Sequence, residues 1–455
     1  MLDQLTTILD ARYVLTGDDT AKWARDWTGA YVATPLAVVR PGSTAEVAAI
    51  MTLAHAHGQA VVPVSGNTGL NGGAFGENAL LLSVDRLNQI EDIDAEGRTA
   101  TVGAGVILSQ LHEAVDAHDL IFPLTFGARG SAMIGGVLST NAGGSNVVRY
   151  GNTRDLVFGI EVVMADGRIM NLMTALHKDN SGLNLRHLMI GAEGTLGIIT
   201  RAIVKLHAKP HAYGTATVAM KSLPAALALL NRLQDATGGA VEAFEFMPRS
   251  YITGHLNVVA GAKPPFDQAY DVNVLVEVGE DATRLTQVLG AGLEAGDVLD
   301  AVIAQNEGQR AEMWARREAA AEIAFHTKPF VDTDIAVPLP QVATFLDEAK
   351  TRLAKLDAGA SDLVVAHLGD GNIHYTAYPT RDDADLKVAI KEMVEDIVAE
   401  LGGSFSAEHG VGISKLGTMA RRKDPVALDT MWAIKQALDP KGILNPGKFY
   451  PPRNG

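Results

Sequence analysis

Cysteine is absent from the 455 residues of this chain. Its absence excludes disulfide bonds, thiolate metal sites, iron–sulfur ligation and a cofactor linked through cysteine. Any metal ion must therefore be bound by His, Asp or Glu side chains. A chain without cysteine is also compatible with a reducing compartment.

Long apolar runs and basic clusters are missing as well. No stretch reaches the roughly eighteen consecutive apolar residues of a membrane-spanning helix, and the segment Met1–Thr6 lacks the basic and apolar regions of a secretory signal. Asp and Glu outnumber Lys and Arg by 53 to 38, which gives a formal net charge of -15, and no basic run follows the pattern of a nucleic-acid site. We expect a cytoplasmic protein without a transmembrane segment or a nucleic-acid partner, with peripheral membrane contact left open.

The length of the chain and its hydrophobic content of 47% predict a globular protein of two or three domains. Residues 36–64 have the pattern of a strand–helix–strand unit, whose helix begins at the capping box Ser43-Thr-Ala-Glu46 and ends near Gly58. Beyond about residue 212, apolar strands alternate with helical patterns, which indicates a second domain of α+β type. Helices are predicted there near 223–235, 281–294, 309–326, 340–355 and 383–401.

A glycine-rich loop follows the second strand of that unit. Pro63–Gly73 has glycines at positions 66, 69, 72 and 73 and no Lys or Arg. Glycine permits positive φ and close backbone approach, so successive N–H groups can converge on the oxygens of a diphosphate. No G-x-x-x-x-G-K-[ST] motif occurs, and Gly103-Ala-Gly105 lacks the third glycine of G-x-G-x-x-G, so an NAD-dependent enzyme is the least favoured class. A plain surface loop is the alternative.

Two further segments are rich in small residues. Residues 127–144 form a tract that is long for an ordinary connection, and residues 191–197 form a shorter turn. The uncharged polar side chains in the longer tract are those of Ser131, Ser139, Thr140 and Asn141. A single ligand contacted by all three segments must be large.

Together these motifs resemble the flavoproteins of the vanillyl-alcohol oxidase and p-cresol methylhydroxylase superfamily, in its D-2-hydroxy-acid dehydrogenase branch. That branch includes D-lactate and D-2-hydroxyglutarate dehydrogenases. The resemblance runs nearly end to end through Pro63–Gly73, Pro123–Gly144, Arg149-Tyr-Gly151, Gly194–Ile199 and Leu444–Lys448. It implies an α+β fold with a two-part FAD-binding domain of the p-cresol methylhydroxylase type over residues 1–210. It further implies an α+β cap, or substrate, domain with an antiparallel sheet and a metal site over 211–410, and a C-terminal segment, 411–455, that returns to the FAD domain.

The resemblance also implies which residues contact FAD. They are Pro63, Ser65, Gly66, Asn67, Thr68, Gly69, Leu70, Gly73, Pro123, Thr125, Gly130, Ser131, Gly135, Gly136, Ser139, Thr140, Asn141, Gly143, Gly144, Tyr150, Gly151, Glu193, Gly194, Gly197, Ile198, Ile199 and Asn445. Non-covalent FAD is expected, because the first loop carries no histidine and the chain has no cysteine.

Two short segments concentrate histidine and carboxylate side chains. His367 and His374 flank the turn-prone sequence Gly-Asp-Gly-Asn, and Glu408 stands next to His409 between small residues. Two imidazoles and one carboxylate leave coordination positions open, as in a catalytic metal site. The alternative is that each histidine caps a turn or is hydrogen-bonded in the core.

The resemblance implies a role for each of these residues. His367, His374 and Glu408 are expected to bind a divalent metal, with zinc the first candidate and manganese, cobalt or iron suited to the same ligands. His409 is expected to act as general base while hydride passes from the α-carbon of the substrate to flavin N5. Arg317, with Arg316 as the alternative, is expected to bind the substrate carboxylate in a bidentate manner. Without the resemblance, both arginines would be read as an ordinary charged helix face.

Three departures from the family pattern bear on the substrate. In 2-hydroxyglutarate enzymes a lysine stands at the position of Asp332, a threonine at that of Ala321 and an asparagine at that of Thr376. A second carboxylate would therefore lack a partner, which predicts a short monocarboxylate such as D-lactate. The alternative is D-2-hydroxyglutarate or a D-malate-like diacid, reached if another basic residue such as Lys328 turns toward the substrate.

Other functional classes stay open at this stage. One is a non-catalytic FAD-binding subunit of a larger oxidoreductase complex, and another is an oxidase that passes electrons to oxygen. The electron acceptor of a dehydrogenase is expected to be a quinone, a cytochrome or an electron-transfer flavoprotein. A homodimer is an expectation from the family alone.

Overall fold

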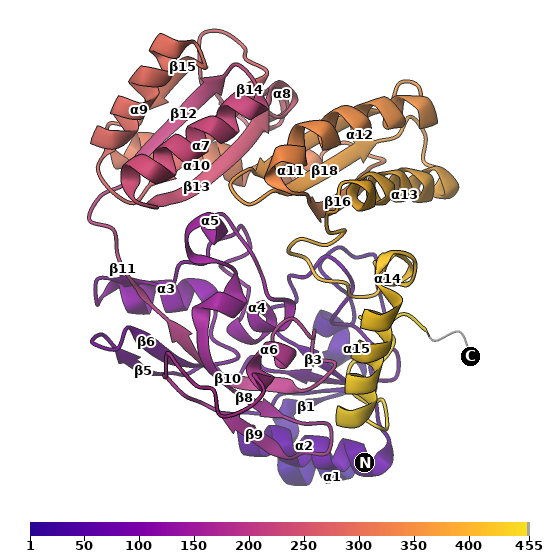
Figure 1. Cartoon of the computed structure of the whole chain (residues 1–455). Helices are drawn as coiled ribbons and strands as arrows, with labels where there is room; N and C mark the ends of the chain where they lie inside the picture. The colour runs from indigo at the N-terminus through magenta and orange to yellow at the C-terminus, as the bar shows by residue number, and fades with distance from the viewer. Residues whose placement is uncertain (453–455) are drawn as a thin grey trace.

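The computed structural model describes residues 1–452 and shows two bodies, one above the other (Figure 1). The lower body contains the N-terminal part of the chain, and the upper body contains its middle part. The chain then returns, so that its last helices lie against the lower body. Within residues 1–452, no helix has both the length and the apolar character needed to cross a membrane.

The lower body begins with a small sheet in the order β1-β2-β4-β3. Its strands are β1 (Val14–Leu15), β2 (Ala37–Val39), β4 (Leu80–Ser83) and β3 (Val61–Val64), and β4 runs parallel to both of its neighbours. Helix α2 (Thr44–His57) connects β2 to β3. Ser43 caps this helix by accepting a hydrogen bond from the N–H of Glu46, and Gly58 ends it with φ of 63°. The predicted strand–helix–strand unit is therefore confirmed, with β4 inserted between its two strands.

A second sheet completes the lower body, in the order β5-β6-β10-β8-β9 with every neighbouring pair antiparallel. Its strands are β5 (Ile90–Asp94), β6 (Thr99–Gly103), β10 (Ile198–Lys205), β8 (Val157–Val163) and β9 (Ile169–Leu172). Helices α3 (Leu108–Asp116), α4 (Ile134–Thr140) and α6 (Leu185–Met189) contribute apolar side chains to the same core as this sheet.

The upper body is built on an antiparallel sheet in the order β15-β12-β14-β13-β17-β18-β16. The strands are β15 (Val298–Ile303), β12 (Gly214–Met220), β14 (Val272–Val278), β13 (Val241–Pro248), β17 (Ser361–His367), β18 (Asn372–Tyr378) and β16 (Val331–Ala336). This sheet and the two sheets below it confirm the predicted α+β fold with an antiparallel sheet in the cap.

Helices cover both faces of the upper sheet. One face packs on α7 (Leu223–Thr237), α9 (Ala282–Ala295), α12 (Val342–Leu356) and α13 (Ala384–Glu400). The other packs on α8 (Arg249–Val258), α10 (Glu307–Glu318) and α11 (Ala320–Ala324). The prediction of a single helix near 309–326 is wrong, because this segment forms two helices, α10 and α11, divided at Ala319. The buried hydroxyl of Tyr251 donates to the carbonyls of Arg316 and Arg317, which stabilises this helix end.

The C-terminal segment is tied back to the first sheet. Helices α14 (Leu416–Arg422) and α15 (Pro425–Leu438) lead to a short parallel bridge between Val61 and Leu444. The buried ammonium of Lys435 donates to the carbonyls of Thr195 and Leu444 and to the carboxylate of Asp439. On this arrangement we propose the division 1–210, 211–410 and 411–455, of which 453–455 lie outside the described residues.

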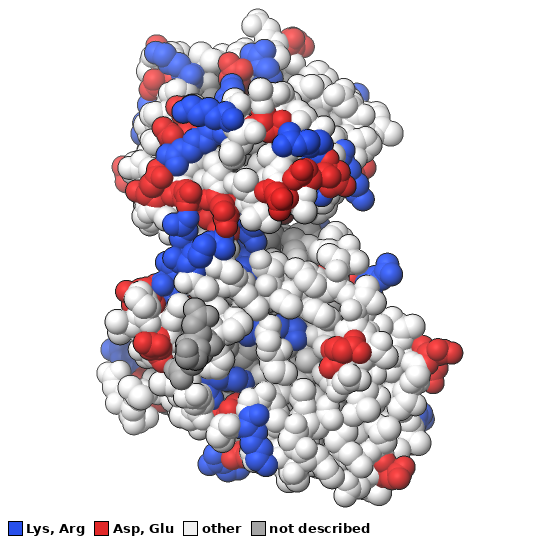
Figure 2. Space-filling view, turned by 90° about the vertical axis from the view of Figure 1, so that its right-hand side faces the viewer, with Lys and Arg blue, Asp and Glu red and all other residues white. Residues whose placement is uncertain are grey.

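Shorter elements connect these parts of the chain. They are α1 (Leu2–Ile8), η1 (Ala11–Tyr13), η2 (Gly17–Trp23), β7 (Leu120–Ile121), α5 (Val147–Tyr150), η3 (Thr153–Leu156), β11 (His207–Ala208) and η4 (Leu339–Gln341). On the face in Figure 2, Lys and Arg are interspersed with Asp and Glu over the upper body, and much of the lower body carries neither. This face therefore lacks the continuous basic track that follows a nucleic-acid backbone.

Candidate functional site

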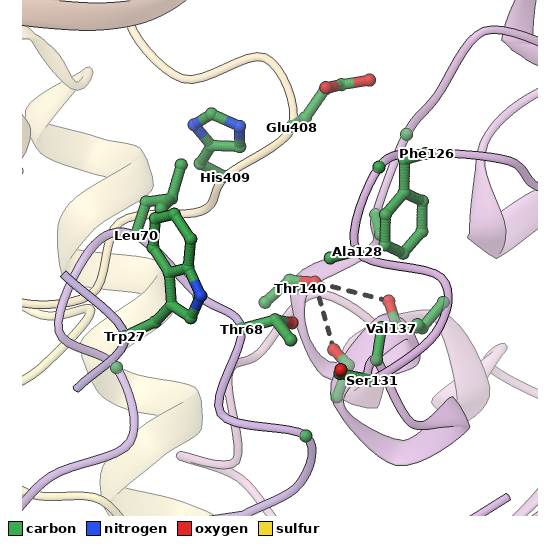
Figure 3. Close-up of a pocket in the computed structure, with 18 of the residues that line it drawn as sticks. Trp27, Thr68, Leu70, Phe126, Ala128, Ser131, Val137, Thr140, Glu408 and His409 are labelled. Atoms are coloured by element: carbon green, nitrogen blue, oxygen red, sulfur yellow. Dashed lines mark hydrogen bonds between the residues drawn. The ribbon is translucent and has the colours of Figure 1, made fainter. Parts of the chain in front are cut away.

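A cavity of about 800 Å³ lies between the two bodies and is lined by residues of both. In Figure 3, Trp27, Thr68 and Leu70 lie along one side of it, and Phe126 and Ser131 lie along the opposite side. Glu408 and His409 project from a chain segment above them, pointing in different directions. The cavity thus brings together loops that are far apart in the sequence.

Most of the residues predicted to contact FAD line this cavity. They are Pro63, Ser65, Gly66, Asn67, Thr68, Gly69, Leu70, Gly73, Thr125, Ser131, Gly135, Gly136, Ser139, Thr140, Gly143, Glu193, Gly194, Gly197, Ile198 and Ile199. All three small-residue segments of the sequence therefore meet at one place.

The other predicted FAD contacts lie outside the lining; they are Pro123, Gly130, Asn141, Gly144, Tyr150, Gly151 and Asn445. Some of them support residues that do line it. The amide of Asn445 donates to the carbonyls of Gly73 and Glu193 at 3.0 and 2.8 Å. Asn141 ends α4 in the left-handed conformation, and the hydroxyl of Tyr150 donates to the carboxylate of Glu242.

The chemistry of the lower wall fits a diphosphate-containing cofactor. A β-carbon on Gly66 would lie 2.2 Å from the carbonyl oxygen of Ser131, so only glycine lets these two segments meet. The N–H of Gly136 donates to the hydroxyl of Ser65 at 3.1 Å across the same contact. Among the described residues that line the cavity, the single Lys or Arg is Arg317 of the upper body. A diphosphate at the lower wall would therefore be held by backbone N–H groups and hydroxyls.

Residues 404–415, which we call the strap, carry Glu408 and His409 and are held from both bodies. From above, the carboxylate of Asp334 accepts the backbone N–H groups of Glu408 and His409, each at 2.9 Å. From below, the Asn71 amide donates to the carbonyl of His409 at 2.9 Å, and the Glu193 carboxylate accepts the N–H of residue 411 at 2.6 Å. The backbone of both predicted functional residues is thus fixed.

The side chains of His367, His374 and Glu408 lie close together. The Nε2 atoms of His367 and His374 lie 3.7 and 3.8 Å from the two carboxylate oxygens of Glu408, and the two rings are 5.4 Å apart. The opposite nitrogens face other carboxylates: His367 Nδ1 is 2.8 Å from Glu245, and His374 Nδ1 is 3.9 Å from Asp334. Metal-binding histidines commonly have such a carboxylate on their second nitrogen, so the residues fit a divalent metal.

A second grouping of side chains at this place can also hold a metal. Asp334, His374, Glu408 and His409 each offer one ligand atom, all within 4.8 Å of one another. Asp334, however, already accepts two strap N–H groups, and its other oxygen accepts the amide of Asn372 at 2.9 Å. Its Oδ2 is therefore engaged by the strap and its Oδ1 by Asn372.

Burial and neighbouring charges give the groups of the cluster distinct protonation tendencies. Burial lowers the pKa of His374, which keeps its imidazole neutral, and burial raises the pKa of Glu408. Burial also lowers the pKa of His367, but the carboxylates of Glu245 and Glu408 outweigh it and raise this pKa to about 9. Burial of Glu245 is in turn outweighed by His367 and Arg317, which hold the Glu245 pKa below its usual value. The carboxylates of Glu245 and Glu408 therefore stabilise positive charge at this buried place.

The last turn of α10 places one of the two candidate arginines on the cavity. Arg317 lines it, and its Nε donates to Glu245 at 2.6 Å. Arg316 is equally buried but lies outside the lining, where its guanidinium reaches the carbonyl of Lys263 at 3.5 Å. Neither arginine therefore belongs to an ordinary solvated helix face.

The three departures from the family pattern all line the cavity. Asp332 accepts a hydrogen bond from the hydroxyl of Thr376 at 2.8 Å, and Ala321 lies on the wall contributed by α11. Burial raises the pKa of Asp332. Lys328 is not among the lining residues.

Some lining or supporting residues were missed from the sequence. Trp27, whose side chain is 58% exposed, lies on the cavity although its segment carries no motif. Phe126 and Trp314 also line the cavity, and nothing in their local sequence distinguishes them from core aromatics. Glu245 did give a signal, because a carboxylate inside the apolar run Val241–Pro248 must have buried partners.

Comparisons with known proteins agree with this geometry. A model described as FAD binding domain matches residues 35–173, and one described as FAD linked oxidases, C-terminal domain, matches residues 209–449. A D-2-hydroxyglutarate dehydrogenase of Xanthomonas citri pv. viticola is 36% identical over 95% of this chain and 93% of the relative. One of Stutzerimonas stutzeri is 34% identical over 99% of this chain and 98% of the relative. The structure of p-cresol methylhydroxylase with substrate bound superposes with a TM-score of 0.76 at 15% identity, over 100% of this chain and 97% of that one, which confirms the predicted fold.

Proposed function

This chain belongs to the family of FAD-linked oxidases, and we propose that it is an FAD-dependent dehydrogenase that oxidises a D-2-hydroxy acid to the 2-oxo acid. The observation that carries the proposal is the single cavity that joins the glycine-rich loops to a His, Glu and Arg cluster. An extended dinucleotide and a small acid can occupy it together. FAD, when bound, supplies the acceptor for the hydride that leaves the α-carbon.

The chain's own residues supply binding and proton transfer. The guanidinium of Arg317, held by Glu245 through Nε, keeps its terminal nitrogens for a carboxylate. His409 lies next to the His374 ring, with centroids 5.8 Å apart, and its backbone is fixed on both sides. We assign to His409 the removal of the hydroxyl proton. Leu363, Val365 and other apolar residues of the upper wall limit access of water to the reacting atoms.

We also propose that His367, His374 and Glu408 hold a divalent metal, with zinc the first candidate. Imidazole and carboxylate ligands suit zinc, and two His with one carboxylate leave positions open for a substrate. A divalent cation, when bound, lowers the pKa of the substrate hydroxyl. The convergence of these residues with Arg317 and His409 argues against a non-catalytic FAD-binding subunit.

Two substrates are candidates within the class. The names of the relatives favour D-2-hydroxyglutarate over the D-lactate that the sequence departures predicted. One observation still favours a short monocarboxylate as the second candidate. Among the described lining residues Arg317 is the single Lys or Arg, and the lining residue Asp332 occupies the position of the family's lysine for a second carboxylate. The electron acceptor is proposed to be a quinone, a cytochrome or an electron-transfer flavoprotein.

Anaerobic bleaching of the flavin absorption tests both the activity and the substrate. We expect the purified protein to show flavin bands that bleach on addition of D-2-hydroxyglutarate or D-lactate and stay unchanged with L-lactate. The D-acid that bleaches the flavin faster is the preferred substrate, and it shows whether the site favours a second carboxylate. A protein without flavin absorption, or one that neither D-acid reduces, would contradict the proposed function.

Replacing Asp332 with lysine is expected to shift the substrate preference toward the diacid. The substitution puts a cation where Asp332 lies on the cavity wall, so the ratio of kcat/KM for D-2-hydroxyglutarate to that for D-lactate should rise by about tenfold or more. Asp332→Asn, which removes the charge without adding one, should give a smaller rise. Equal ratios in both variants and the unaltered enzyme, with FAD content retained, would show that residue 332 does not determine specificity.

A further inference from the structure

One carboxylate in the upper body holds two residues of the proposed site at once. Glu245, with a side chain that is 1% exposed, lies in the middle of β13. Its Oε2 accepts the Nε–H of Arg317 at 2.6 Å, and its Oε1 is 2.8 Å from Nδ1 of His367. Each oxygen therefore serves a different functional side chain.

The sheet and its covering helices dictate this arrangement. Glu245 and His367 stand directly opposite each other in the antiparallel pair β13–β17, so their side chains leave the same face of the sheet as neighbours. Arg317 reaches the pair from the end of α10, where the hydroxyl of Tyr251 holds its carbonyl at 3.1 Å. A buried carboxylate is costly unless it is paired and hydrogen-bonded, and here both conditions are met.

The two contacts have directional consequences. With Nδ1 of His367 engaged by Glu245, the nitrogen turned toward Glu408 is Nε2, at 3.7 Å, and Nε2 is therefore the atom placed to bind a cation. With the Nε–H of Arg317 engaged, its terminal nitrogens remain for a ligand, and Nη2 stays within 3.5 Å of the His367 ring.

We propose that Glu245 is the positioning residue that orients the carboxylate-binding guanidinium of Arg317 and the metal-binding imidazole of His367 together. The inference rests on the proposed function and adds a shared anchor to it. Because both groups share one anchor, loss of Glu245 is expected to weaken the binding of a divalent cation and of the substrate carboxylate together.

Glu245→Gln is the variant that tests this role. Glutamine keeps the size of the side chain but has one acceptor oxygen and one NH₂ group, so one of the two N–H donors meets another donor. We expect zinc affinity, measured by competition with a chromogenic chelator on the FAD-loaded protein, to fall by about 10-fold to 100-fold. We expect KM for the D-2-hydroxy acid to rise at least tenfold, while FAD stoichiometry and the visible spectrum stay unchanged. Glu245→Asp, which is shorter and keeps the charge, should shift both quantities in the same direction and carries the test if the glutamine variant is insoluble.

Glu277→Gln is the matched control. Glu277 is also a buried carboxylate of the upper sheet, on the adjacent strand β14. It binds Arg310 at 2.7 Å and the indole N–H of Trp314 at 2.8 Å, but it contacts no histidine and does not itself line the cavity. Its variant should keep both zinc affinity and KM, whatever it does to thermal stability. Tyr251→Phe separates the role at Arg317 from the role at His367. It removes the hydrogen bonds to the carbonyls of Arg316 and Arg317 but none to His367, so it should raise KM and leave zinc affinity unchanged.

The zinc titration needs no turnover, so it distinguishes failure of this inference from failure of the proposed function. Wild-type zinc affinity and KM in a soluble Glu245 variant would overturn the inference alone. If the unaltered protein binds zinc but no D-2-hydroxy acid reduces its flavin, the proposed function fails. A weakened zinc site in the Glu245 variants would then still support the positioning of His367. An unaltered protein that binds no zinc would overturn both the metal assignment and the shared anchor.

Discussion

Replacement of His409 by alanine is expected to lower the rate of flavin reduction by the D-2-hydroxy acid about 10²- to 10⁴-fold, the usual contribution of a positioned general base. Among the described residues of the cavity wall, His409 is the one histidine that the proposed metal set leaves for proton transfer. Its backbone N–H and carbonyl are bound by Asp334 and Asn71, so removal of the imidazole should leave the strap in place. FAD and metal contents should therefore match those of the unaltered enzyme.

Anaerobic stopped-flow spectroscopy measures this effect directly, because the flavin reports the hydride-transfer step without the electron acceptor. His118→Ala is a suitable control, since His118 is exposed and lies outside the cavity. A His409 variant that reduces its flavin at the rate of the unaltered enzyme would assign the base to another group.

Replacement of Glu408 by alanine is expected to remove the metal and most of the activity while FAD remains bound. Glu408 is the side chain that both His367 and His374 face, at 3.7 and 3.8 Å. A bound cation stabilises developing charge by several kcal/mol, and each 1.36 kcal/mol is a factor of ten, so turnover should fall by at least about 10²-fold. Gly143 leaves room for this carboxylate, because a β-carbon there would lie 2.5 Å from its oxygen.

Metal content by mass spectrometry and flavin content by absorption separate the two losses. Glu318→Ala provides the comparison, because Glu318 also lines the cavity but forms its ion pair with Arg129 at 2.8 Å. That variant should retain the metal. A Glu408 variant with full metal content and full turnover would show that the ion, if present, is bound elsewhere.

Local sequence patterns were sufficient for the strand–helix–strand unit of the lower body. The helix between Ser43 and Gly58 was predicted with its caps, because capping depends on side chains a few residues apart. The division of the predicted helix 309–326 could not be foreseen, because it involves the hydroxyl of Tyr251, a residue distant in sequence. The same long-range dependence hid Trp27, which has no motif around it.

For the site, the residue types and their spacing indicated the chemistry, and the resemblance assigned the roles. Glycines without basic neighbours indicated a backbone-bound diphosphate, and His367, His374 and Glu408 indicated a metal. The two indications of the substrate disagree. The sequence departures favour D-lactate, whereas the names of the relatives favour D-2-hydroxyglutarate. The preference for one of these substrates depends on the charge at a few positions such as Asp332. The overall sequence identity to a relative is insensitive to single positions of this kind.

The composition excluded disulfides and thiolate metal sites, and the order of the motifs identified the family and its cofactor, because such properties depend on which residues are present. The functional contacts depended on how the chain closes. Asp334 binds the strap although the two are about seventy-five residues apart in the sequence. Glu245 on β13 contacts both Arg317 on α10 and His367 on β17. Such contacts depend on sheet register and on the packing of helices over a sheet face, which a linear pattern does not encode. The sequence therefore supplied the chemical groups, and the fold determined which of them act as a unit.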